Sequence, residues 1–160
     1  MTTETIENFA EERRQFLRRV LRTRAPAAAI LIRAAVGTVF VSEGLQKFLF
    51  PGELGVGRFV RIGIPLPEIA APFVGAFEIT CGALVLLGLF TRLAAIPLVT
   101  VMIVALASTK VPILLEQGFW KMAHEARTDW AMVLGAVFLL IDGAGPWSID
   151  ARIGRDGITS

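Results

Sequence analysis

Residues 27–50 (AAAILIRAAVGTVFVSEGLQKFLF) form an apolar stretch long enough to cross a bilayer, yet it contains Arg33, Glu43 and Lys47. At about 1.5 Å per residue, a helix of this length spans roughly 36 Å, against about 30 Å of membrane hydrocarbon. A charged side chain near the middle of such a helix costs about 2.5–3.5 kcal/mol. We therefore expect these charged side chains to face other helices and to find partners there.

The composition supports a membrane protein. Of the 160 residues, 54% are hydrophobic, and the mean hydropathy is +0.65, whereas soluble domains are about 45–50% apolar. The net charge of +2 is too small to indicate a nucleic-acid-binding protein. The single cysteine, Cys81, excludes an internal disulfide and the paired thiols of intramembrane thiol oxidoreductases. Its simplest role is that of a small residue in helix packing.

Three further apolar stretches follow the first one. Turns rich in proline and glycine, or clusters of charged residues, separate them, and two of the connections contain amphipathic pieces that suit the membrane interface. The sequence therefore predicts an all-α membrane protein, a bundle of four transmembrane helices with short interfacial helices in its loops. The expected spans are 27–50, 68–90, 93–107 or a little beyond, and 129–141, with interfacial segments in 51–67 and 108–128. The last span is short at thirteen residues, so we expect it to include neighbouring residues as well.

The chain divides into an N-terminal arm (1–25), a membrane domain (26–153) and a short tail (154–160). The arm contains four glutamates and six arginines and has no apolar core of a signal peptide. It is either an amphipathic helix on the lipid surface or a solvated topology signal. With four spans, nine basic residues lie on the side of the termini and six on the other side. This bias predicts a multi-pass protein of the cell (inner) membrane with both termini in the cytoplasm.

One face of the first span is polar or small along its length. At about 100° per residue, Arg33, Gly37, Gly44 and Lys47 fall on a single stripe together with Phe40. This face must point into the bundle. On the same side of the helix, Glu43 and Lys47 are spaced i,i+4, and we expect them to form an ion pair.

The second span contains one acidic residue, Glu78. Counted from the predicted cytoplasmic surface, Arg33 lies roughly 9 Å deep and Glu78 roughly 18 Å deep. In antiparallel neighbours, two such long side chains can meet, so we expect an Arg33–Glu78 ion pair. The pair would either fix the register of the helices or line a polar pocket for a ligand headgroup or a proton path. Arg33 could instead extend its side chain to the membrane surface.

A second charged cluster, His124, Glu125 and Asp129, lies in the predicted outer connection. Its spacing matches no common metal-ligand pattern and there is no second histidine, so no metal site is predicted. A set of salt bridges with Arg127 is the simpler interpretation. His124 could still donate a proton at the outer face.

Several segments, in this order and spacing, resemble the DoxX family of small four-span membrane proteins over about residues 27–153. They are the first-span residues Arg33, Gly37, Gly44 and Lys47, followed by GIPLP (63–67), FEITCGALVLLGLFTR (77–92), STKVPILLEQGFW (108–120), HEARTDWAM (124–132) and GAGPWSID (143–150). The resemblance implies a four-helix membrane bundle. The family takes its name from a subunit associated with a thiosulfate–quinone oxidoreductase. Other members are described as redox-stress components or assembly factors.

The resemblance implies that the polar positions of the family's first two helices correspond in this chain to Arg33, Glu43, Lys47 and Glu78. We expect a redox-associated subunit with a pocket for a quinone or a lipid-like ligand between the first two spans, and with no intrinsic cofactor. Glu78 and Glu43 would move protons. The ligand contacts would come from Arg33, Lys47, Phe40, Gly37 and His124.

Two other functions stay open: a non-enzymatic scaffold or assembly partner of a membrane complex, and a small-molecule carrier. The expected partners are membrane lipid, a quinone, a partner redox protein and a second copy of the chain. Nucleic acid is not among them.

Overall fold

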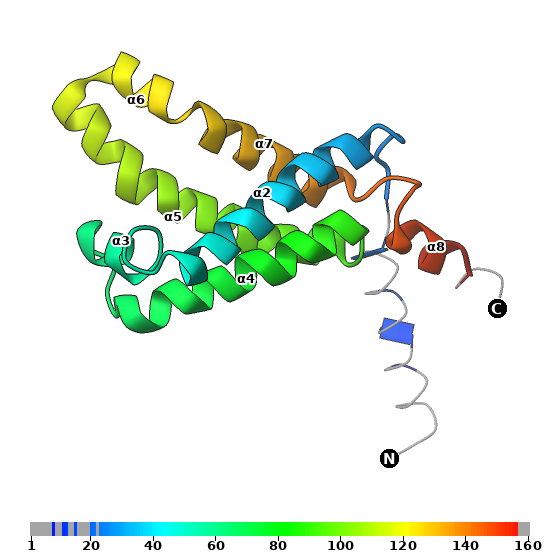
Figure 1. The fold of residues 1–160 in the computed structure, drawn as a ribbon. Helices are drawn as coiled ribbons and strands as arrows, with labels where there is room; N and C mark the ends of the chain where they lie inside the picture. Colours follow the sequence, from blue (N-terminus) through cyan, green and yellow to red (C-terminus); the bar gives the residue numbers. More distant parts are fainter. Residues whose placement is uncertain (1–7, 9–10, 13–14, 16–19, 22, 157–160) are drawn as a thin grey trace.

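A computed structural model describes residues 23–156, together with residues 8, 11, 12, 15, 20 and 21 (Figure 1). The described part is helical, with turns and short loops between the helices. The helices are α2 (Ala29–Leu49), α3 (Val56–Arg61), α4 (Pro67–Leu87), α5 (Thr91–Gln117), α6 (Phe119–Glu125), α7 (Arg127–Asp142) and α8 (Ile149–Asp156). The prediction for the arm (1–25) falls largely outside the described residues.

The closest packing in the bundle is between α2 and α4, which run antiparallel (Figure 1). A Cβ atom added to Gly37 would lie 2.8 Å from the carbonyl oxygen of Gly82, and one added to Gly44 would lie 2.6 Å from that of Gly75. The two backbones therefore touch at two places, two helical turns apart, and only glycine allows this approach. These contacts fix the register of α2 against α4.

We call the end of the bundle where α2 begins and α4 ends the proximal end, and the opposite end the distal end. The buried core lies toward the proximal end and is shared by α2, α4, α5 and α7. It consists of Val36, Phe40, Cys81, Val85, Ala94, Leu98, Met102, Met132, Ala136 and Leu139. Toward the distal end, α5 and α7 lead away from α2 and α4 (Figure 1).

Residues 143–150 close the proximal end. The buried carboxylate of Asp150 accepts hydrogen bonds from the backbone N–H groups of Phe90 (2.7 Å) and Thr91 (3.0 Å), at the start of α5. The positive end of the α5 dipole thus faces a negative charge. Gly145 has φ +83°, and a Cβ atom there would lie 2.9 Å from the carbonyl oxygen of Pro26. The segment therefore needs glycine at this position both for its backbone conformation and for space.

The predicted all-α membrane class is confirmed. Three helices of the described part, α2, α4 and α5, are long and apolar enough to cross a membrane. α7 packs along α5, but its 16 residues span only about 24 Å. The number of four spans therefore stays a prediction. The inward stripe on the first span is confirmed, because Arg33, Gly37, Phe40 and Gly44 are all buried.

The end of the third span was predicted wrongly. The sequence predicts a span that ends near residue 107, whereas α5 continues to Gln117. An ion pair allows the continuation, because Lys110, which suggested a loop, contacts Asp129 of α7 (Nζ–Oδ2, 3.1 Å). The helix also accommodates Pro112 and ends at Gln117, before Gly118, whose φ is +84°.

The glycine contacts can be tested by Gly44→Val. The added side chain would collide with backbone and side-chain atoms of α4, so we expect α2 and α4 to separate and the thermal midpoint in detergent to fall by more than about 5 °C. Gly52→Ala is the matched control, because a Cβ atom there meets nothing within 4 Å. Equal midpoints for the two variants would contradict the register described here.

Candidate functional site

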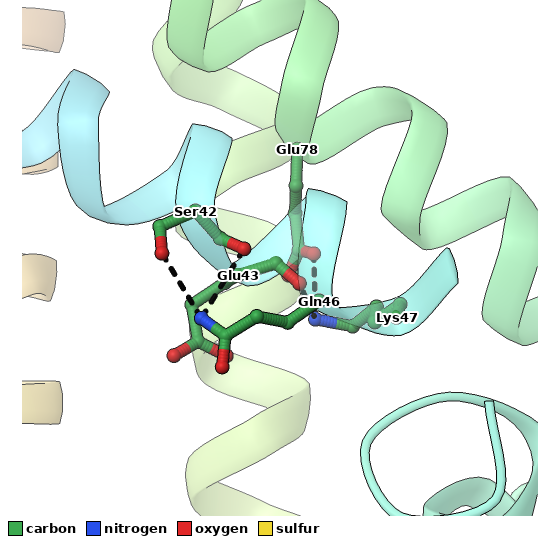
Figure 2. A network of polar contacts seen from close by, with 5 residues as sticks. All are labelled: Ser42, Glu43, Gln46, Lys47 and Glu78. Carbon is green, nitrogen blue, oxygen red and sulfur yellow. Dashed lines mark hydrogen bonds and ion pairs between the residues drawn. The ribbon is translucent and has the colours of Figure 1, made fainter. Parts of the chain in front are cut away.

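The site begins with an ion pair between α2 and α4. The Nζ atom of Lys47 lies 2.6 Å from Oε2 of Glu78, and the two side chains are only 10% and 5% exposed (Figure 2). Lys47 also donates to the backbone carbonyl oxygen of Glu43 at 3.4 Å. The positive charge of Lys47 and the negative charge of Glu78 are thus paired between two helices that are long enough to span a membrane.

The helix register explains why Lys47 is the partner of Glu78. With Gly37 against Gly82 and Gly44 against Gly75, Glu78 lies about one and a half turns closer to the proximal end than Lys47. Side chains on a helix lean toward its N-terminus. Because the two helices are antiparallel, Lys47 leans proximally and Glu78 leans distally, so their side chains converge.

Arg33 has other partners. Its guanidinium donates to the carbonyl oxygens of Val85 (3.0 Å) and Leu86 (2.6 Å), in the last turn of α4, and to those of Ala144 (3.3 Å) and Trp147 (2.8 Å) in the proximal segment. The negative end of the α4 dipole adds to this attraction. Arg33 is 3% exposed, so it acts as a structural clamp of the proximal end.

The predicted Arg33–Glu78 pair is therefore wrong. The sequence predicts a depth difference of roughly 9 Å, which two long side chains could bridge, but Arg33 leans proximally and Glu78 distally, so the side chains diverge. The predicted Glu43–Lys47 side-chain pair is also wrong. Lys47 contacts the backbone carbonyl of Glu43, and the Glu43 carboxylate points away from it (Figure 2).

A cavity of about 1020 Å³ adjoins the Lys47–Glu78 pair. It lies among α2, α3, α4, α5 and the start of α7, and most of its lining is aliphatic or aromatic. Five charged residues contribute to the lining: Glu43, Lys47, Arg58, Glu78 and Asp129. An apolar cavity with a few charged groups is a common form of ligand site.

The structure brings together four of the predicted site residues and leaves out three. Phe40, Glu43, Lys47 and Glu78 all line the cavity. The lining does not include Arg33, Gly37 or His124. Gly37 instead packs against α4. His124 is exposed on α6, where its Nδ1 atom lies 3.2 Å from Nη1 of Arg127.

Sequence reasoning missed several lining residues. Arg58 comes from α3, and its alternation with apolar residues suggested an interfacial helix but no site. Phe73 and Phe77 lie one turn apart on α4, with ring centroids 4.7 Å apart. Their i,i+4 spacing next to Glu78 was the available signal. Asp129 was considered only as part of the outer cluster.

The outer cluster forms salt bridges, but not with Arg127. Glu125 pairs with Lys121 (3.1 Å) and Asp129 pairs with Lys110 (3.1 Å). The hydrogen bond and the positive charge of Lys121 lower the pKa of Glu125 below its ordinary value. Glu125 is fully exposed, so this pair contributes little to stability.

Comparison with known proteins connects this geometry to a family. The sequence model of DoxX matches residues 28–111, which include all of α2, α3 and α4 and most of α5. The chain belongs to the DoxX family. The resemblance stated from the sequence is thus confirmed.

The relatives are membrane proteins or are named for redox chemistry. The chain is 50% identical to "Uncharacterized membrane protein Rv3486" of Mycobacterium tuberculosis, over 86% of this chain and 88% of that protein. It is 30% identical to "Inner membrane protein YphA" of Escherichia coli, over 79% and 91% of the two chains. It is 29% identical to "Putative oxidoreductase CatD" of Bacillus subtilis, over 76% and 83%. No solved structure matches this chain significantly.

The structural role of Arg33 predicts a specific mutational result. Arg33→Ala removes a buried cation that holds four carbonyl oxygens. Each charged hydrogen bond is worth about 1.5–3 kcal/mol. The four contributions are not additive, and for a net loss of about 3 kcal/mol we expect the thermal midpoint in detergent to fall by about 6–12 °C. Arg33→Lys should recover only part of the loss, because an ammonium group cannot reach all four acceptors.

The control for Arg33 is Arg61→Ala. Arg61 also donates to two carbonyl oxygens, those of Gly52 and Glu53, but on the exposed surface. Its loss should change the midpoint by less than about 2 °C. If Arg33→Ala and Arg61→Ala were equally mild, Arg33 would not be a structural clamp.

Proposed function

We propose that the protein is a redox-associated subunit of the cell (inner) membrane that binds a quinone in the cavity beside Lys47 and Glu78. The observation that carries the proposal is the buried Lys47–Glu78 pair, which forms part of the wall of a large apolar cavity. Ionisable groups at membrane depth are expensive, so their position on a cavity wall favours a functional role. The similarity to "Putative oxidoreductase CatD" supports a redox context.

The charges of the site favour a neutral ligand headgroup. On the wall formed by α2, α3 and α4, Glu43 and Glu78 are balanced by Lys47 and Arg58. An anionic phospholipid headgroup would therefore find no excess of positive charge. A quinone is neutral, and its carbonyl oxygens need only hydrogen-bond donors.

The rest of the cavity suits a flat ring with an apolar tail. The aromatic pair Phe73–Phe77 lies next to Glu78 along α4 and lines the cavity. Aromatic rings attract one another in stacked or edge-on arrangements. A volume of about 1020 Å³ is at the upper end of the range for drug-sized ligands, which leaves room for part of an isoprenoid tail.

Each charged residue has a distinct role in this proposal. Lys47 donates a hydrogen bond to a carbonyl oxygen of the oxidised ligand, and Glu78 accepts one from a hydroxyl of the reduced ligand. Glu43 lines the cavity and forms no ion pair within the described residues, so it can carry protons between the ligand and water. The electrons come from a partner redox protein, because the chain itself carries no redox group in this proposal.

The topology belongs to the same proposal. With α7 as a fourth span, both termini lie in the cytoplasm, as the bias of basic residues favours. The proximal end then faces the cytoplasm. The Lys47–Glu78 pair lies toward the opposite end, and the cavity beside it extends from the start of α5 at the proximal end to the start of α7 at the distal end.

The experiment is quinone binding to the purified full chain in lipid nanodiscs. The probe is a dimethyl-naphthoquinone whose ring positions next to the carbonyls are both blocked, so that it cannot alkylate Cys81, which also lines the cavity. Lys47→Met should weaken binding roughly 10- to 100-fold, the value of one charged hydrogen bond. Glu78→Gln should weaken it less, because the amide preserves shape and hydrogen bonding.

The control is Lys121→Met, which breaks the exposed Lys121–Glu125 pair away from the cavity and should leave binding unchanged. If the wild-type chain bound no quinone and retained none from native membranes, the proposed function would be wrong. Retention of a partner protein by both wild type and Lys47→Met, without any quinone, would instead favour the scaffold hypothesis.

A further inference from the structure

The wall opposite Lys47 and Glu78 also contains polar groups. At the distal end of the same cavity, α5 contributes Ser108 and Thr109, and the start of α7 contributes Thr128 and Asp129. Asp129 is held by Lys110 of α5 (3.1 Å). The cavity therefore has one polar region on the α2–α4 wall and a second one on the α5–α7 wall, with apolar side chains between them.

Most hydroxyl groups on this second wall are already in use. Ser108 donates to the backbone carbonyl of Val104 (2.8 Å), and Thr109 donates to that of Ala105 (2.6 Å). Closer to the proximal end on the same wall, Thr100 donates to the backbone carbonyl of Ile96 (3.0 Å). Each of these hydroxyl protons is thus directed at the residue's own helix.

Thr128 differs from these residues. It is an exposed residue in the first turn of α7, its hydroxyl forms no hydrogen bond within the described part of the chain, and its side chain lines the cavity at its distal end. The neighbouring Asp129 contacts Lys110 through Oδ2. Its Oδ1 atom forms no ion pair or hydrogen bond with the described residues and can accept a hydrogen bond from a ligand. The second region thus offers one donor and one acceptor, as Lys47 and Glu78 do on the first.

We infer that Thr128 and Asp129 form a second polar subsite, so that the cavity binds a ligand with two oxygen functions, one held at each wall. The inference rests on the proposed function and adds to it that both oxygens of the dione, or of its two-electron-reduced diol, are bound, one at each wall. A donor and an acceptor at each wall can bind a carbonyl or a hydroxyl oxygen. The two subsites therefore suit both redox forms of such a ligand.

The test compares two ligands of similar shape on wild type and variants in nanodiscs. One is the blocked dimethyl-naphthoquinone, and the other is a methyl-tetralone, a bicyclic ketone with one carbonyl. Thr128→Val removes the hydroxyl with little change of shape. We expect it to weaken dione binding roughly 3- to 10-fold, the value of one hydrogen bond, and to change ketone binding less than about 2-fold. Thr128→Ser should restore dione binding.

The matched control is Thr38→Val, which makes the same chemical change outside the cavity, at a hydroxyl that donates to the backbone carbonyl of Ala34 in its own helix. It should leave the affinity for both ligands unchanged. If Thr128→Val did not alter the preference for the dione, the second subsite would be refuted while the proposed function stood. If wild type bound neither ligand, the proposed function would fail first, and this inference with it.

Discussion

The contact between α2 and α4 determines most of what this chain can do. Gly37 lies against Gly82 and Gly44 lies against Gly75, so the two backbones are in contact. A shift of one helix along the other in either direction would bring larger side chains into collision with the backbone. In a membrane, lipid tails are as apolar as leucine side chains, and small residues that permit close packing replace the hydrophobic effect as the source of helix association. The register that results decides which charged side chains can meet.

That register gives Arg33 and Lys47 different partners, although the two basic residues lie on the same face of the first predicted span. Arg33 leans toward the proximal end, where the carbonyl oxygens at the end of α4 and in residues 143–150 receive it. Lys47 leans along α2 into the bundle and meets Glu78. One cation closes the bundle, and the other forms part of the wall of a cavity. The different roles of Arg33 and Lys47 follow from the antiparallel arrangement of α2 and α4 and from the direction in which helical side chains lean.

Helical periodicity was sufficient to predict the inward face of α2, because burial of Arg33, Phe40 and Gly44 requires only a single stripe at 100° per residue. It was not sufficient to predict the partners. Depth along the membrane normal ignores side-chain direction, and this omission paired Arg33 with Glu78. The pocket was predicted between the first two spans, but its extension to α3, α5 and α7 was not. That extension depends on the divergence of α5 and α7 from α2 and α4, which no local sequence pattern indicates. The length of α5 was missed because Lys110 suggested a loop, whereas its charge is satisfied by Asp129 from α7.

In the function that we propose, Lys47 and Glu78, and not Arg33, face the ligand. A structure of the full chain purified from native membrane in its own lipid is the most direct test. We expect density for a flat headgroup within hydrogen-bond distance of Lys47 Nζ, with Arg33 still bonded to the carbonyl oxygens at the proximal end. A cavity filled by rearranged side chains, or a ligand bound at Arg33 with Lys47 and Glu78 remote from it, would contradict these roles.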